Sequence, residues 1–336
     1  MVTIAQIAEK VGVSSATVSY VLNKRDAKVG ISEGTRLRVL STASALGYQP
    51  NRAGRALATG KSSLVALWMP HLLSAFYAKM VYSIEMEVRR SAYDLIVSGV
   101  RGDDPTSIPN TIALPCHVDG VLAFDTDYPA ELANTPGSPA VVTLGVHDAN
   151  PVDLKTDTIT VDLEPGAQAA MRHLLAQGYR RIAFMSGVDN CHENEIRYAT
   201  YARSMREAGL HPEYIHGSTH VVRSRPMARE VLKAYVAGRG CPEAIFCLND
   251  EWAIGVCRAL RELGLKIPTD VAVVGCDGID DAEYYEPPLS TIGQPFEEMS
   301  RLAWRMLCER MEDRSAPLRR VNLTAQFVER ESSRRK

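Results

Sequence analysis

The sequence predicts an N-terminal all-α helix-turn-helix head with a hinge helix, followed by an α/β core of two doubly wound parallel-sheet subdomains. Three observations support this fold class. Capped helical patterns fill the first 49 residues, a short linker with Pro50 and Gly60 follows, and apolar strand runs then alternate with helical patterns. Such alternation is typical of parallel sheets covered by helices on both faces. The 336 residues, 46% of them hydrophobic, are enough for a core in each part.

Helix start and stop signals define the head. Thr3 and Gln6 have the spacing of a capping box, which predicts the start of a first helix. Gly12 supplies the permissive backbone of a tight turn, and Ser14 is a favourable N-cap for a second helix. A third helix is predicted over 32–46 because Gly47 follows as a stop signal.

The second helix has an inner and an outer face. Val18, Val21 and Leu22 have the helical spacing of a buried face. The outer face then carries Ser15, Ala16, Ser19 and Tyr20. In a helix-turn-helix domain, this face of the second helix enters the major groove of DNA.

Charge supports a nucleic-acid partner over a three-helix bundle with no such role. Residues 1–60 carry eight basic and three acidic side chains, a net charge of +5. The rest of the chain carries 30 basic and 37 acidic side chains, a net charge of −7, so the total of −2 hides a basic head on an acidic body. This asymmetry favours a polyanionic partner at one end of the chain.

The linker and the strand pattern set the expected domain boundaries. Residues 51–58 can form two helical turns, but eight residues that include Gly54 are too few for a stable isolated helix. We therefore expect a hinge helix that folds only when docked. The expected domains are a head at 1–49, a hinge at 50–61, a first core subdomain at 62–160 plus 292–336, and a second core subdomain at 161–291.

Two series of strands build the two core subdomains. The first has strands at Leu64–Met69, Asp94–Ser98, Gly120–Phe124 and Ala140–Leu144, with a helix over 76–92. The second has strands at Ile182–Met185, Ala244–Cys247 and Val271–Gly275, with helices near 164–177, 194–208, 226–236 and 250–263. Residues 158–162 and 287–294 are interpreted as crossings between the subdomains, and a last helix over 296–309 returns to the first. A ligand cleft is expected at the carboxyl ends of the strands.

Composition argues against several other classes of protein. No apolar run approaches the roughly eighteen residues needed to cross a bilayer, and no secretory leader opens the chain. The seven cysteines are scattered and never form a C-x-x-C pair, which favours reduced thiols in a cytoplasm. The eight histidines have no metal-binding spacing, so we expect no metal site and no cofactor.

Taken together, these motifs resemble the LacI/GalR family of transcriptional regulators over nearly the whole chain. The landmarks are Thr3–Asn23, Tyr48–Asn51, Val118–Val121, Arg180–Gly187, Asn249–Asp250, Val273–Asp277 and Pro287–Gln294. The resemblance implies a cytoplasmic homodimer, most simply a repressor, whose paired heads bind operator DNA. It also implies a periplasmic-binding-protein-like core that closes on a small-molecule effector such as a sugar or a related metabolite.

The resemblance assigns DNA-contacting positions. Base-contacting positions are occupied by Ser15, Ala16 and Tyr20, and phosphate-contacting positions by Thr3, Ser14, Thr17, Ser19 and Asn23. Leu57 falls at the hinge leucine that enters the minor groove and helps to kink the duplex, with a leucine packed on the core as the alternative. Because Ser15 and Ala16 lack a bidentate side chain, readout would depend on Tyr20, methyl contacts and DNA shape.

The resemblance also assigns an effector site. Arg197 matches the family's effector-binding arginine and Asp277 its acidic partner, a pair that suits sugar hydroxyls or a nucleobase edge. The further candidates are Phe76, Asp125, Glu193 and Asn249. Glu193 stands four residues before Arg197, so an i,i+4 salt bridge on a helix is the alternative to a ligand contact. The acidic run Asp280, Asp281 and Glu283 is predicted to be a solvated loop.

Two other functions share the two-lobed core. A nucleotide or sugar enzyme is disfavoured because no G-x-G-x-x-G, P-loop or G-x-S-x-G pattern is present. A solute-binding receptor for a transporter requires export, which the basic head and the missing leader disfavour. The end of the chain lacks sustained leucine heptads, which favours a dimer over a tail-linked tetramer. Whether the effector induces or co-represses stays open.

Overall fold

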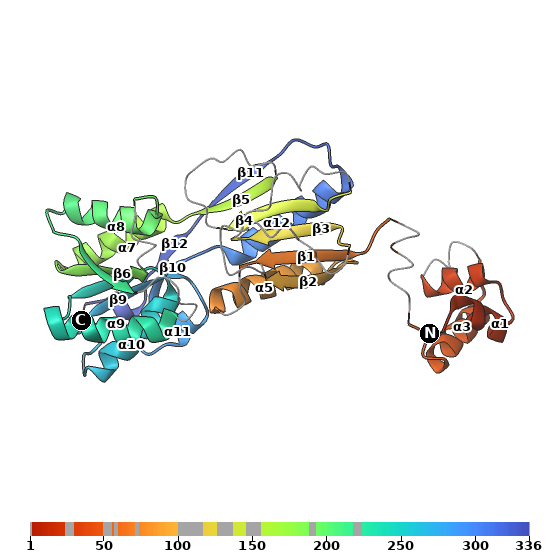
Figure 1. Cartoon of the computed structure of the whole chain (residues 1–336), viewed down its shortest axis with the longest axis horizontal. Coiled ribbons are helices and arrows are strands. Elements are labelled where there is room, and N and C mark those ends of the chain that lie inside the picture. The colour runs from red at the N-terminus through yellow and green to blue at the C-terminus, as the bar shows by residue number, and fades with distance from the viewer. Residues whose placement is uncertain are drawn as a thin grey trace. The chain divides into compact units, whose positions relative to one another are not determined.

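The structure is a computed structural model that describes residues 2–23, 30–49, 56, 60–70, 74–99, 117–125, 137–145, 156–187, 193–217 and 224–335. It divides into two compact units, residues 1–62 and 63–336 (Figure 1). We call these units the head and the core and describe each by itself. No helix in the described ranges combines the length and the apolar character that a membrane crossing requires.

The head contains the three predicted helices, α1 (Ile4–Val11), α2 (Ser15–Leu22) and α3 (Glu33–Ala45). The capping box at the start of α1 is complete, because the Thr3 amide donates to Gln6 Oε1 at 2.9 Å and the Gln6 amide donates to Thr3 Oγ1 at 3.3 Å. Ser14 and Ser32 cap α2 and α3 in the same way through backbone amides three residues ahead. Apolar side chains from all three helices form one small core.

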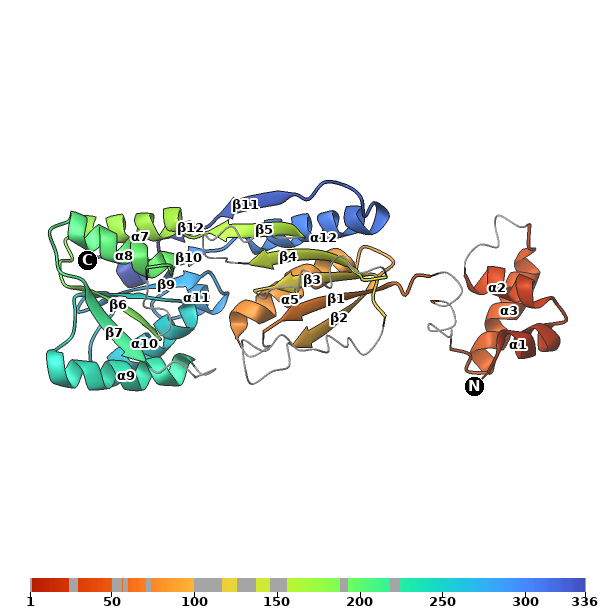
Figure 2. The same cartoon turned by 45° about the horizontal axis from the view of Figure 1, so that its top comes forward.

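The first lobe of the core is built on a six-stranded sheet in which all neighbouring strands are parallel (Figure 2). In spatial order its strands are β11 (Arg320–Thr324), β5 (Asp157–Asp162), β4 (Ala140–Gly145), β3 (Gly120–Phe124), β1 (Leu64–Met69) and β2 (Asp94–Gly99). Two helices, α5 (Ala75–Val88) and α12 (Phe296–Glu312), pack against each other and against this sheet. The inward strand positions are buried apolar residues, as the apolar runs predict.

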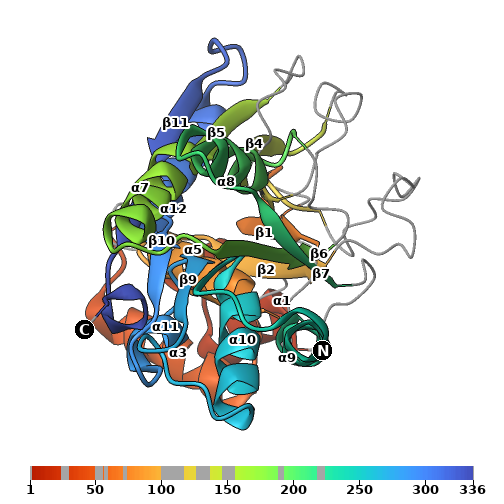
Figure 3. The same ribbon diagram turned by 90° about the vertical axis from the view of Figure 1, so that its left-hand side faces the viewer.

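The second lobe repeats this plan. In spatial order its strands are β12 (Gln326–Val328), β10 (Ser290–Gly293), β9 (Ala272–Asp277), β8 (Ala244–Cys247), β6 (Ile182–Gly187) and β7 (Glu213–Gly217). One face carries α7 (Glu164–Ala176) and α8 (Ile196–Glu207), and the other carries α9 (Ser224–Arg239) and α10 (Asp250–Glu262) (Figure 3). A short helix, α11 (Asp281–Tyr284), follows β9, and a 3-10 turn at Glu331–Ser333 packs beside β9 and β10.

The crossings between the lobes differ from the prediction in three respects. Residues 290–293, part of the segment 287–294 interpreted as a crossing, form β10, an internal strand of the second sheet, so the chain crosses only after Gly293. Residues 158–162 are part of β5, an internal strand of the first sheet, so the chain crosses only after Asp162. The segment 292–336, assigned as a whole to the first subdomain, crosses once more between β11 and β12, and β12 pairs antiparallel with β10 in the second sheet. The sequence did not predict this crossing because β11 and β12 are short, mostly polar strands at sheet edges.

The crossings decide where residues of the two lobes meet. The chain leaves the first sheet at the carboxyl end of β5 and the second at the carboxyl end of β10. Because strands in a parallel sheet share one direction, the carboxyl ends of β3 and β9 lie at the same edges as those of β5 and β10. Side chains that follow β3 and β9 are therefore directed to the region between the lobes.

Candidate DNA-binding and effector sites

Helix α2 separates its buried and exposed side chains as the recognition-helix prediction requires. Val18 and Val21 are buried in the head core, whereas Ser15 and Ala16 are exposed and Tyr20 is 39% exposed. The three predicted base-contacting residues therefore share the solvent-facing side of one helix. An exposed tyrosine beside two small side chains leaves this surface able to approach base edges closely.

The predicted phosphate-contacting residues already make local hydrogen bonds, four of them at helix ends and Ser19 within α2. Ser14 Oγ accepts from the Thr17 amide at 3.1 Å, and the two hydroxyls are 2.9 Å apart. Asn23 Nδ2 donates to the Ser19 carbonyl at 2.8 Å, and Thr3 forms the capping box of α1. Each hydroxyl is thus oriented by the helix that it caps or ends. The hinge residue Leu57 lies outside the described residues.

Asp277 stands at the carboxyl end of β9 in a constrained setting. Its φ of 120° belongs to a region that favours glycine, and Gln294 Nε2 donates to its Oδ1 at 3.1 Å. Burial raises the pKa of the Asp277 carboxyl well above its ordinary range; the charge of Asp250 raises this pKa further, whereas Arg197 and Gln294 oppose the shift. A buried, strained carboxyl at a strand end is the kind of group that gathers at binding sites.

Arg197 is directed inward and is bound by a partner that the sequence analysis missed. Its Nε donates to Glu195 Oε1 at 2.7 Å, and its Nη1 donates to the Leu248 carbonyl at 2.8 Å. Burial lowers the pKa of the Arg197 guanidinium, but the charges of Glu195, Cys276 and Asp277 outweigh burial and raise it. Arg197 therefore stays charged beside Asp277.

Glu193 does not form the i,i+4 ion pair considered as its alternative role. Helix α8 begins at Ile196, so Glu193 precedes the helix, and its side chain is exposed. Glu195 caps α8 instead, accepting from the Tyr198 amide at 2.7 Å, and it is buried against Arg197. The helix predicted near 194–208 is present at Ile196–Glu207, and the buried carboxylate of Glu195, not Asn194, is its N-cap.

The first lobe contributes Asp125 and Tyr77. Asp125 follows β3 with a φ of 48°, and it is hydrogen-bonded to the Tyr77 hydroxyl. Burial raises the pKa of Tyr77, and the charges of Asp125 and then Asp277 raise it further. Because one carboxyl from each lobe raises the pKa of Tyr77, Asp125 and Asp277 both lie near this residue, in the region between the lobes.

Phe76 and Asn249 have structural partners. Phe76 is buried in an aromatic cluster, with ring centroids 5.4 Å from those of Phe124 and Phe296. Asn249 is half-buried, and its Oδ1 caps α10 by accepting from the Trp252 amide at 3.0 Å. Phe76 packs beside Phe124, which precedes Asp125, and Asn249 precedes Asp250, so both residues are next to groups of the interlobe region. The amide oxygen of Asn249 is already hydrogen-bonded to the start of α10.

Asp250 organises the loop that carries Asp277. Its Oδ2 accepts from the amides of Gly278 and Ile279 at 2.8 and 2.9 Å, and its Oδ1 accepts from the Thr291 hydroxyl at 2.7 Å. Burial raises the pKa of Asp250 to about 7, although these three hydrogen bonds lower it. Asn249 therefore caps α10, and Asp250 holds the loop that follows β9.

The acidic run after Asp277 is exposed, as predicted, but Asp281 and Glu283 lie in the short helix α11, and Asp280 forms an ion pair with the first lobe. Lys79 on α5 donates to the Gly278 carbonyl at 2.8 Å and to Asp280 Oδ1 at 2.7 Å. The Ala75 amide at the start of α5 donates to Glu251 Oε1 at 3.3 Å. The sequence analysis missed these contacts because the partners are about two hundred residues apart in sequence, which no local pattern reveals.

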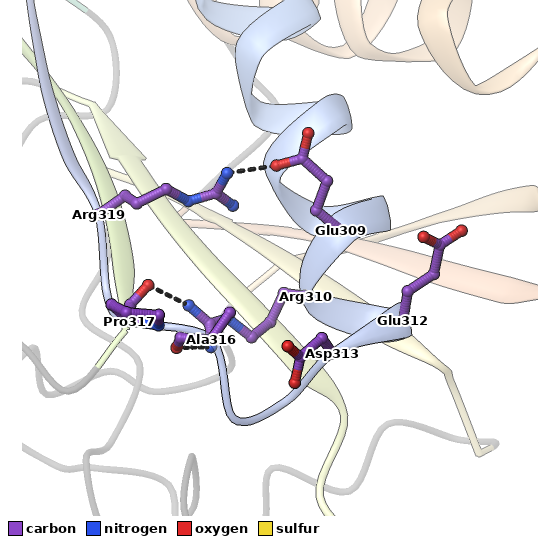
Figure 4. A pocket seen from close by; sticks show the side chains of 7 residues that line it. All are labelled: Glu309, Arg310, Glu312, Asp313, Ala316, Pro317 and Arg319. Carbon is purple, nitrogen blue, oxygen red and sulfur yellow. Dashed lines mark hydrogen bonds and ion pairs between the residues drawn. The ribbon is translucent and has the colours of Figure 1, made fainter.

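A separate hollow of about 460 Å³ at the end of α12 is a structural feature (Figure 4). Arg310 lies there with its guanidinium bonded to both Asp157 oxygens and to the carbonyls of Ala316 and Pro317. Its donors are therefore used to close the loop between α12 and β11. Within the described ranges, no three His, Cys, Asp or Glu side chains are grouped so that they could hold a metal ion.

Comparisons with known proteins identify both parts of the chain. Residues 3–51 match the family described as bacterial regulatory proteins, lacI family, and residues 171–333 match the periplasmic binding protein-like domain. The HTH-type transcriptional repressor PurR of Vibrio vulnificus strain CMCP6 is 29% identical over 336 residues, covering 99% of this chain and 98% of the relative.

Solved structures agree along the full length. The lac repressor dimer bound to operator and the anti-inducer ONPF is 25% identical with a TM-score of 0.78, covering 99% of each chain. The complex of the transcriptional regulator CelR with cellobiose is 26% identical with a TM-score of 0.64, covering 99% of this chain and 100% of that one. With the capped helix-turn-helix head and the two-lobed core, these matches show that the chain belongs to the LacI family of bacterial regulatory proteins.

Proposed function

We propose that this protein is a transcriptional repressor that binds operator DNA through α2. Its affinity for the operator falls or rises when a small effector binds between the core lobes. The observation that carries the DNA-binding part is the exposed face of α2 with Ser15, Ala16 and Tyr20. The basic charge of the head supports a polyanionic partner, and the related lac repressor is a dimer on its operator. We assign Leu57 to the minor groove, and to phosphates the five polar residues Thr3, Ser14, Thr17, Ser19 and Asn23.

The convergence of Asp125, Arg197 and Asp277 supports effector binding between the lobes. A sugar or a related metabolite suits these groups because carboxylates and a guanidinium bond hydroxyls well. The relative CelR is a complex with cellobiose. Effector binding would shift the balance between arrangements of the lobes, and operator affinity would follow only if the two arrangements hold the hinges differently. On this proposal the protein works as a homodimer in the cytoplasm, where its DNA lies.

The experiment is selection of duplexes from a random pool by the full-length protein, followed by titration of the selected site at several salt concentrations. A near-palindromic consensus is expected, with affinity at least 10³-fold above that for random DNA and a steep loss of affinity with salt. The control is a full-length variant in which Ser15, Ala16 and Tyr20 are all replaced by Asp. Its head should still fold, but the exposed face of α2 should repel DNA. Equal enrichment of all sequences would contradict the proposal.

A further inference from the structure

The guanidinium of Arg197 in the candidate effector site is already paired with the carboxylate of Glu195. Glu195 contacts Arg197 Nε at 2.7 Å, and the side chains are only 7% and 15% exposed. The carboxylate is fixed independently of the arginine, since its second oxygen caps α8 through the Tyr198 amide. The positive charge of Arg197 is therefore balanced before any ligand arrives.

The remaining groups that face the region are acceptors or acids. Asp277 and Asp125 come from opposite lobes, and both raise the pKa of Tyr77 through their charge. The charges that act on Asp277 are the carboxyl groups of Asp250 and Asp125 and the guanidinium of Arg197, which Glu195 already contacts. Burial and the charges of Asp250 and Asp125 raise the pKa of Asp277, so the neighbourhood disfavours negative charge, and an anionic ligand would meet the same penalty.

An unsatisfied acceptor supplies an independent indication of what the site binds. Gln294 is only 8% exposed, and the amide nitrogen of its side chain is used by Asp277. The oxygen of the same amide is buried and has no hydrogen-bond partner among the described residues. Because a buried polar atom without a partner is costly, an occupant that donates a hydrogen bond there is favoured.

We propose that Glu195 is a specificity-determining residue that makes this site select effectors without negative charge and rich in hydrogen-bond donors, namely free polyols or amines and not their phosphates or carboxylates. This inference rests on the proposed effector site between the lobes. Glu195 acts by engaging Nε of Arg197 and balancing its charge, which weakens the guanidinium as an anion-binding group. Asp125, Asp277 and Gln294 then accept from hydroxyl or ammonium donors.

The first test uses Glu195→Gln with Glu207→Gln as its matched control, since the control removes the same charge from an exposed position at the far end of the same helix, α8. Glutamine can keep the α8 cap through its amide oxygen, but it no longer balances Arg197. The probe is inorganic phosphate, titrated against chloride at constant ionic strength while the unfolding midpoint is measured. Saturable phosphate binding is expected to be at least tenfold tighter for Glu195→Gln than for the wild type or the control. Equal phosphate affinity in all three proteins would overturn the proposal.

The second test needs no variant, so it stands even if Glu195→Gln does not fold. Wild-type unfolding midpoints are measured with matched sets of compounds: free hexoses, amino sugars and nucleosides, each against its phosphate ester or uronic acid. Every stabilising compound is expected to be uncharged or cationic, with at least tenfold weaker binding of its anionic counterpart. Tighter binding of an anionic member than of its parent would overturn the proposal. Failure of the operator selection described above would contradict the proposed function but would leave this charge preference measurable.

Discussion

Individual aspartates in this protein show how surroundings set the charge of one residue type. Asp157 is completely buried, and burial opposes its ionisation, but hydrogen bonds from Arg310 and Arg319 outweigh burial and lower its pKa. Asp250 is equally buried but is bonded only to amides and a hydroxyl, so burial prevails and raises its pKa to about 7. Asp157 holds the loop between α12 and β11 through ion pairs with arginines. Asp250 holds the loop after β9 through a carboxyl whose pKa is about 7.

Arg310→Met should destabilise the core by about 3–5 kcal/mol, because it leaves the Asp157 carboxylate buried without its cation. Urea unfolding of the full-length protein measures this loss. The folded pKa of Asp157 is lowered, so its stabilising contribution is present above the ordinary aspartate pKa of about 3.9 and is lost as the pH falls below it. The difference between wild type and variant should therefore narrow as the pH falls below about 4.

The control for this prediction is Arg89→Met, which breaks a surface pair with Glu85 and should cost at most about 1 kcal/mol. An Arg310→Met loss no larger than that of Arg89→Met would show that the buried pair does not fasten the loop.

Tyr20→Ala should weaken binding to the selected operator by about 1–3 kcal/mol while sparing most binding to random DNA, because base contacts carry specificity. Fluorescence anisotropy with both duplexes measures the two affinities. Leu37→Ala on α3, also exposed in the head, is the control and should change neither. Equal losses on both duplexes would remove Tyr20 from base recognition.

Secondary-structure elements were predicted well where they are apolar inside or clearly capped. The helices of the head follow from Thr3, Ser14 and Ser32, and β1, β3 and β4 follow from runs that are buried on both faces. Strands β7, β11 and β12 escaped prediction because edge strands alternate polar and half-buried residues and are short. The internal strands β5 and β10 were interpreted as crossings because both are rich in polar residues and each directly precedes a crossing. Pairing partners supplied by the rest of the sheet, and not local propensity, decide these strands.

Helix α5 and the loop after β9 form a contact between lobes that can be tested directly. Lys79→Met should remove the bonds to the Gly278 carbonyl and Asp280, so backbone amides of residues 278–284 should exchange hydrogen faster. Hydrogen–deuterium exchange with mass spectrometry measures this change. Lys233→Met, which removes a surface pair with Glu262 on helices of the same lobe, should leave the segment unchanged. Unaltered exchange in Lys79→Met would show that the bonds do not hold the lobes together.

The candidate effector site could be predicted in part from the sequence. Asp277 and Asp125 act on the same tyrosine because the ends of parallel strands carry both, whereas Arg197, in the first turn of α8, acts on Asp277. Glu195 and Gln294 were missed, since a buried ion pair and an amide against Asp277 depend on packing between elements. Their only local signals were position, Glu195 two residues before Arg197 and Gln294 at the end of the segment 287–294. Glu193, chosen for its spacing, is exposed.

Control of DNA binding by the core requires that effector and operator influence each other through the same protein. Thermodynamic linkage then fixes their relation: the factor by which effector changes operator affinity equals the factor by which operator changes effector affinity, typically about 5–150-fold. Asp277→Ala should abolish the response to effector while leaving the dimer folded and able to adopt its effector-free operator affinity. If the effector is an inducer, the variant stays on DNA; if it is a co-repressor, the variant stays off.

The most direct measurement is calorimetric titration of a stabilising compound from the matched sets into wild-type protein with and without the selected operator, together with operator titration at saturating compound. For the wild type, equal factors in the two directions are expected; for Asp277→Ala, neither compound binding nor any change in operator affinity is expected. Operator affinity that stays the same at saturating compound, or wild-type compound affinity in Asp277→Ala, would contradict these expectations.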